Sequence, residues 1–110
     1  MTTYLTNAFS INMLPRREHI VIFRPIHPTQ AENEIKDAID EGDFVSAIGH
    51  ASTAAILSKM LGVDIEAQRV NVEFDDKKDI LIVAQYRGPR LEEGATELPE
   101  GATIEFWSVS

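Results

Sequence analysis

Residues 80–86 read I-L-I-V-A-Q-Y, and this run decides the fold. A short apolar run rich in β-branched residues is typical of a strand in a sheet. A charged connection at residues 75–79, D-D-K-K-D, separates it from a second β-rich run at residues 68–74. Because a connection of that length suits a hairpin, we expect the two runs to pair as antiparallel strands.

Three more strands are predicted outside this pair. Their short β-branched or alternating apolar patterns place them at residues 2–7, 19–24 and 103–109. The second of them, H-I-V-I-F-R, is compact enough to be a buried strand. After the first strand, Ser10 is placed to cap a short helical turn that Pro15 ends.

Two helices and a long loop complete the prediction. Apolar residues recur at helical spacing in residues 28–41 and again in residues 54–61. Gly42 and Gly62 follow these segments and supply their stops. Residues 87–101 are rich in Gly, Pro and Glu with little periodicity, so we expect a long functional loop there.

Length and composition limit the architecture. The 110 residues allow one domain, residues 1–110, and 44% hydrophobic content is that of a folded globular chain. The order of elements predicts an α/β fold with a mixed sheet of about five strands flanked by helices. A domain this small buries a limited share of its surface, so a homodimer that adds core is expected.

Charge and cysteine content exclude several classes of function. A net charge of −8 argues against a protein that binds long RNA or DNA. The absence of cysteine removes disulfides, thiolate nucleophiles and zinc ribbons, and favours a reducing compartment. No apolar run approaches the length of a membrane span, and residues 1–12 lack the pattern of a signal peptide. We therefore expect a cytoplasmic protein that does not associate with membranes.

His50 is the side chain best suited to catalysis. It follows Gly49 at the expected mouth of the second helix, where backbone N–H groups and the helix dipole attract phosphate or another anion. A histidine that merely caps or packs the helix is the alternative. The other histidines, His19 and His27, fit a strand end and a loop, and none of the three has metal-site spacing. We therefore expect no metal ion and no other cofactor.

Arginines supply the second chemical signal. Residues 87–94 read R-G-P-R-L-E-E-G, a stiff loop in which Arg90 could fork onto a phosphate. The alternative is a surface loop in which Arg90 pairs with Glu92 or Glu93. Arg69, at the start of the run 68–74, could likewise form only a salt bridge at the rim.

Polar residues gather at strand ends, helix starts and the long loop, where open sheets bind ligands. One histidine with arginines and amides is enough for RNA transesterification, because the 2′-hydroxyl of RNA is itself the nucleophile. The residues in question are Asn7, Ser10, His50, Arg69, Gln85, Arg90 and Glu93.

Four blocks of sequence together resemble one known family. They are Y-L-T-N-A-F-S-I-N-M-L at residues 4–14, I-G-H-A-S-T at 48–53, Q-R-V at 68–70 and R-L-E-E-G at 90–94. In this order they resemble the ring nucleases of the type III anti-CRISPR family over nearly the whole chain. The resemblance implies a small α/β homodimer that binds and cleaves cyclic tetra-adenylate without a metal. This second messenger activates the ancillary nucleases of type III CRISPR defence.

The resemblance also implies roles for individual residues. The catalytic histidine of the family falls on His50, and its ligand-facing arginine and glutamate fall on Arg90 and Glu93. The resemblance implies that Asn7, Ser10 and Arg69 bind the substrate, together with Gly49 beside the catalytic histidine. Gln85 matches a pocket glutamine only if one residue is inserted within Y-R-G-P, and Arg87 has no counterpart.

Two other functions fit the same residues. The protein could bind the cyclic oligonucleotide without cleaving it, as a sponge or a sensor. It could also be an acidic interaction module in which segments 32–43 and 64–79 meet a basic partner. Basic residues alternate with acidic ones in those segments, which weakens the second alternative.

Overall fold

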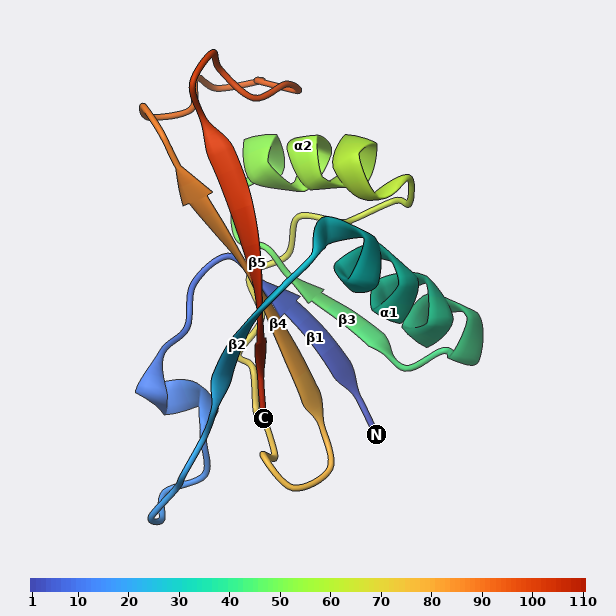
Figure 1. Cartoon of the computed structure of the whole chain (residues 1–110), viewed down its shortest axis with the longest axis vertical. Coiled ribbons are helices and arrows are strands. Elements are labelled where there is room, and N and C mark those ends of the chain that lie inside the picture. The colour runs from blue at the N-terminus through green and yellow to red at the C-terminus, as the bar shows by residue number, and fades with distance from the viewer.

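A five-stranded mixed sheet forms the frame of the molecule (Figure 1). The computed structural model describes all 110 residues. In chain order the elements are β1 (Thr3–Thr6), the 3₁₀ turn η1 (Ile11–Met13), β2 (Phe23–Ile26), α1 (Pro28–Glu41), β3 (Phe44–Ala47), α2 (Ala51–Leu61), β4 (Ile80–Arg87) and β5 (Thr103–Val109). The expected α/β fold with a mixed sheet of about five strands is confirmed.

The strand order of the sheet is β2-β5-β4-β1-β3. β1 lies parallel to both β3 and β4, whereas β5 runs antiparallel to β4 and β2. The carboxyl ends of β1, β3 and β4 therefore meet at one edge of the sheet. That edge is where ligands bind in open α/β sheets.

Each face of the sheet carries its own core. Along β4, Ile82 and Ala84 face the core shared with both helices, while Leu81 and Val83 face the opposite core. Both helices cover the first face, so the prediction of flanking helices holds for one side (Figure 1). Irregular segments cover the other face, to which they contribute Phe9, Met13, Leu14, Val21, Val72 and Phe74.

The two helices begin and end where local sequence signals place them. The ring of His27 accepts a hydrogen bond from the Thr29 amide at 3.1 Å and caps α1. Gly42 and Gly62 end α1 and α2 with φ near +75° and +69°, a left-handed conformation that glycine adopts without strain. Neither helix is long and apolar enough to cross a membrane.

The strand expected at residues 19–24 is displaced and exposed. β2 covers Phe23–Ile26 at one edge of the sheet, and Ile20, ahead of it, is 88% exposed. Pro25 within β2 has no N–H to donate, which suits an edge strand. The prediction of a buried strand was wrong because β-branched composition does not distinguish an edge strand from a central one.

The predicted hairpin was also wrong. Residues 68–74 form no strand, and β4 pairs with β1 and β5 instead. The missing strand is β3, and the chain after α2 covers its outer edge: Ser46 Oγ donates to the Glu66 carbonyl at 2.6 Å, and Gln68 Nε2 donates to the Ser46 carbonyl at 2.8 Å. The apolar residues of the segment pack over the sheet rather than within it, as the buried Phe74 illustrates.

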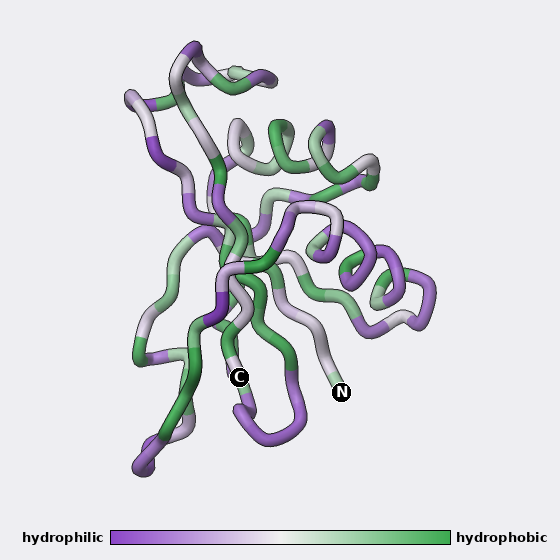
Figure 2. The backbone as a smooth tube through the Cα atoms, in the orientation of Figure 1, coloured by the Kyte–Doolittle hydropathy of each residue, from purple (hydrophilic) through white to green (hydrophobic).

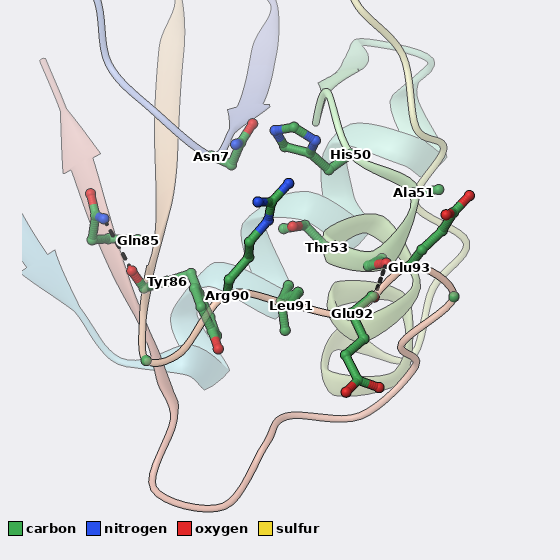
Figure 3. A pocket seen from close by; sticks show the side chains of 13 residues that line it. Asn7, His50, Ala51, Thr53, Gln85, Tyr86, Arg90, Leu91, Glu92 and Glu93 are labelled. Atoms are coloured by element: carbon green, nitrogen blue, oxygen red, sulfur yellow. Dashed lines mark hydrogen bonds between the residues drawn. The ribbon is translucent and has the colours of Figure 1, made fainter.

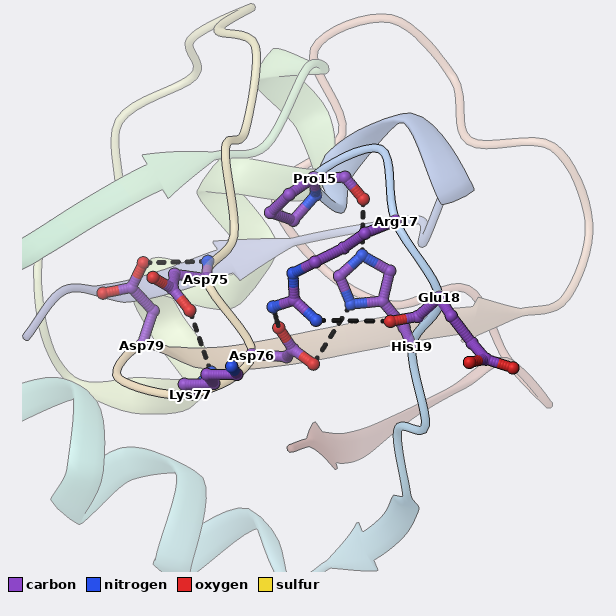
Figure 4. A network of polar contacts seen from close by, with 8 residues as sticks. All are labelled: Pro15, Arg17, Glu18, His19, Asp75, Asp76, Lys77 and Asp79. Carbon is purple, nitrogen blue, oxygen red and sulfur yellow. Dashed lines mark hydrogen bonds and ion pairs between the residues drawn. The ribbon is translucent and has the colours of Figure 1, made fainter.

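A polar network ties the chain after η1 to the turn at residues 75–79 (Figure 4). Asp76 accepts from Arg17 at 2.7 Å and contacts His19 Nδ1 at 3.1 Å, while His19 Nε2 faces the Pro15 carbonyl. The hydrogen bond to His19, with a smaller contribution from Arg17, holds the pKa of Asp76 below its usual range. This turn is hydrophilic, whereas β4, which follows it, is hydrophobic (Figure 2).

Candidate active site

A cavity of about 910 Å³ opens at the carboxyl ends of β1, β3 and β4. Most of its lining residues are polar, and they come from the end of β1, the first turn of α2, the end of β4 and the loop after β4. The lining residues are Asn7, His50, Ala51, Ser52, Thr53, Gln85, Tyr86, Gly88, Arg90, Leu91, Glu92, Glu93 and Gly94.

His50 stands at the N-terminus of α2 (Figure 3). Its backbone is extended, with φ −127° and ψ 130°, and its carbonyl accepts the first hydrogen bond of the helix from the Ala54 amide at 3.0 Å. The imidazole makes no capping hydrogen bond. A ring that is exposed and not engaged as a cap, beside the positive end of a helix dipole, is available to an anionic ligand.

Arg90 reaches the same cavity from the loop after β4. Its guanidinium points toward Asn7 and His50 (Figure 3). Among the ion pairs of the chain, none involves Arg90, so the pairing with Glu93 considered above is not formed. A guanidinium with free donors can bind a phosphate in two-point geometry.

Asn7 joins the end of β1 to the mouth of α2. Its Oδ1 accepts a hydrogen bond from the Gly49 amide at 3.4 Å. Asn7 and His50 also line a second hollow of about 320 Å³, to which Gly49 and Arg69 belong. Arg69 Nε donates to the Gly49 carbonyl at 3.4 Å. The two hollows share Asn7 and His50, so they adjoin each other at these residues.

The remaining predicted residues are less central. Gln85 lies at the rim on β4, where its amide donates to the Tyr86 carbonyl at 3.2 Å. Glu93 lines the cavity, but its side chain points away from Arg90 (Figure 3). Ser10 caps η1 as expected, accepting from the Asn12 amide at 3.3 Å, and does not line the cavity.

Several lining residues were not identified from the sequence. Ser52 and Thr53 lie two and three residues after His50 in the block G-H-A-S-T, and their position in the first turn of α2 was the available signal. Tyr86 carries no such local signal, because its position depends on how the following loop folds back. No three His, Asp or Glu side chains come together in a group that could hold a metal ion.

The fold and the cavity together define a small α/β domain with a polar site at the carboxyl ends of three codirectional strands. The chain belongs to the STIV B116-like family, whose model matches residues 3–106.

Relatives and a solved structure agree with this membership. The chain is 30% identical over 106 residues to the uncharacterized protein ORF116 of Acidianus filamentous virus 1, covering 96% of this chain and 86% of the relative. It is 28% identical over 91 residues to the uncharacterized protein 26 of Sulfolobus islandicus filamentous virus, covering 83% and 72% respectively. The structure of B116 of Sulfolobus turreted icosahedral virus is similar over 99% of this chain and 98% of that one, with a TM-score of 0.85 and 27% identity. These relatives are proteins of archaeal viruses.

Proposed function

We propose that this protein is a metal-independent ring nuclease that binds cyclic tetra-adenylate and cleaves it to linear di-adenylate ending in a 2′,3′-cyclic phosphate. By removing the messenger it switches off type III CRISPR signalling in the cytoplasm of the host cell. One arrangement carries the proposal. The imidazole of His50 stands at the N-terminus of α2 without a capping hydrogen bond, and the guanidinium of Arg90, which forms no ion pair, points toward it in the cavity.

The chemistry follows from these two residues. The ribose 2′-oxygen attacks the adjacent phosphorus in line, a P–O2′ bond forms, and the P–O5′ bond breaks. Protonated His50 gives its proton to the departing 5′-oxygen, and the 2′-hydroxyl proton passes to solvent. Arg90 and the amides at the start of α2 bind the phosphate and stabilise the charge that builds on it.

The dimensions and charge of the site support a small anionic substrate. The cavity of about 910 Å³ lies within the range of pockets for small ligands. Arg90 lines the larger hollow with His50 and Arg69 lines the smaller one with it, while the chain as a whole carries a net charge of −8. Two arginines near His50 on an otherwise acidic protein favour a compact phosphate ligand over long RNA or DNA.

The proposal includes a homodimer. Cyclic tetra-adenylate is compatible with a twofold axis, so a symmetric pair would present two copies of His50 to opposite phosphates. Ile11, Ile20, Ile22 and Phe23 expose apolar side chains, and contact with a second copy would remove such surface from water. Light scattering at assay concentration tests this part, and an active monomer would contradict it.

The decisive experiment incubates the protein with cyclic tetra-adenylate in EDTA under single-turnover conditions and resolves the products by mass. We expect di-adenylate from the wild type. His50→Ala should lose about 10²–10⁴-fold in rate and keep its affinity, since only proton transfer is removed. His27→Ala is the matched control, because His27 caps α1 outside the cavity. An intact ring bound equally by both proteins would instead identify a sponge or sensor, and no binding at all would reject the site.

A further inference from the structure

At the end of β4, a hydrogen bond from the Tyr86 side chain to the backbone holds the start of the following loop. Tyr86 packs its ring against the core under the helices and lines the cavity with one edge. Its hydroxyl donates a hydrogen bond to the carbonyl of Pro89, the residue before Arg90. That carbonyl and the Arg90 amide belong to one planar peptide unit. Holding the carbonyl therefore orients the backbone from which the Arg90 side chain departs.

The absence of a side chain at Gly88 leaves room for this hydrogen bond. A Cβ at this position would lie 2.8 Å from the Tyr86 hydroxyl and 2.6 Å from the Cβ of Ala102. Both distances are shorter than any ordinary carbon contact. The segment Y-R-G-P thus folds tightly around the phenol, with the glycine at the point of closest approach.

A second anchor lies beyond Arg90. Ser52 Oγ, in the first turn of α2, donates to the Glu92 carbonyl at 3.1 Å. Arg90 therefore lies between two carbonyls that accept side-chain hydrogen bonds. The Pro89 carbonyl accepts from Tyr86 on β4, and the Glu92 carbonyl accepts from Ser52 on α2. Arg87, the additional arginine of this loop, pairs with Glu105 at 3.4 Å on the neighbouring strand. Of the two loop arginines, Arg90 alone lines the cavity.

We propose that Tyr86 is a positioning residue for Arg90: its hydroxyl, through the Pro89 carbonyl, aims the guanidinium at the substrate phosphate beside His50. This inference rests on the proposed function and assigns a residue on which that function depends. Tyr86 does not itself touch the reacting atoms. Its contribution appears only through Arg90, and this sets it apart from a residue that merely stabilises the fold.

The test is a double-mutant cycle on kcat/KM for cyclic tetra-adenylate, with Tyr86→Phe, Arg90→Ala and the double variant. Tyr86→Phe keeps the ring and removes one hydrogen bond, so we expect a loss of about three- to tenfold. In the Arg90→Ala background the same change should cost nothing further, because the side chain being aimed is gone. No loss in Tyr86→Phe, or an equal loss in both backgrounds, overturns the proposal.

The other tyrosine of the chain supplies a matched control. Tyr4 also donates its hydroxyl to a backbone carbonyl, that of Glu73 at 3.2 Å, and packs against the opposite core. Tyr4→Phe should leave kcat/KM within twofold of wild type. A loss in Tyr4→Phe as large as that in Tyr86→Phe would trace the effect to general destabilisation and overturn the positioning role.

A readout without ligand separates this inference from the proposed function. The chemical shift of the Arg90 backbone amide, which shares a peptide unit with the Pro89 carbonyl, is expected to change in Tyr86→Phe and to stay as in wild type in Tyr4→Phe. A wild-type protein that neither binds nor cleaves the ring would reject the function. A changed Arg90 amide shift would then still support the hold of Tyr86 on the Arg90 backbone, and an unchanged shift would overturn it.

Discussion

Gly88→Ala should destabilise the protein through a contact that can be measured in the structure. A Cβ at residue 88 would lie 2.6 Å from the Cβ of Ala102 and 3.1 Å from its Cα. Neither atom belongs to a flexible side chain, so the two ends of the loop between β4 and β5 must move apart. Overpacking of this kind costs about 1–3 kcal/mol.

Thermal unfolding measures this cost. For a domain of about this size each kcal/mol shifts Tm by roughly 4–8 °C, so we expect Tm to fall by about 4–24 °C. The single tryptophan, Trp107 on β5, reports the transition by fluorescence, and circular dichroism provides a second probe.

Gly49→Ala is the matched control. A Cβ at residue 49 meets only the Cγ of Arg69, at 3.8 Å, and the backbone of Gly49 is not in the positive-φ region. We therefore expect an unchanged or slightly raised Tm, because alanine restricts the unfolded chain. Equal Tm values for Gly88→Ala and wild type would refute the close approach at Ala102 and, with it, the tight turn that holds Tyr86.

Three further predictions concern stability. Phe74→Ala should cost about 3–5 kcal/mol in urea unfolding, because the ring is fully buried in the core opposite the helices. The pKa of Asp76 is lowered on folding, so its contribution is present above the ordinary carboxyl pKa and is lost as the pH falls through the lowered value. Asp76→Asn should therefore lower Tm at neutral pH and flatten the loss of Tm below about pH 4, whereas an unchanged Tm–pH profile would exclude the contact with His19 as the cause. Ser46→Ala removes a donor to the Glu66 carbonyl at the edge of β3 and should cost about 0.5–1.5 kcal/mol, with faster amide exchange in β3 as the local readout.

The candidate site was predictable where its residues carry local signals. His50 follows a glycine at the start of a helical pattern, and the structure puts it at the N-terminus of α2. Arg90 and Asn7 could be located at a loop and a strand end, and both line the cavity with His50. Ser10 has an equally clear capping signal and still lies outside the cavity. Capping is local, whereas the direction in which a cap faces depends on packing.

Local sequence determined the elements whose limits depend on neighbouring residues alone. Gly42 and Gly62 end the two helices because a left-handed residue closes a helix wherever it occurs. The apolar runs that form β4 and β5 were identified for the same reason, since each has enough buried residues to be a strand in any sheet.

Tertiary structure decided which segments pair and which side chains meet. Residues 68–74 have strand composition but lie over the sheet, while β3 takes the place beside β1. Pairing of distant strands depends on the whole set of buried surfaces, which no single segment encodes. The convergence of Asn7, His50 and Arg90, and the hold of Tyr86 on the peptide before Arg90, arise in the same way. They exist only once parallel strands bring their carboxyl ends to one edge and the long loop folds back across them.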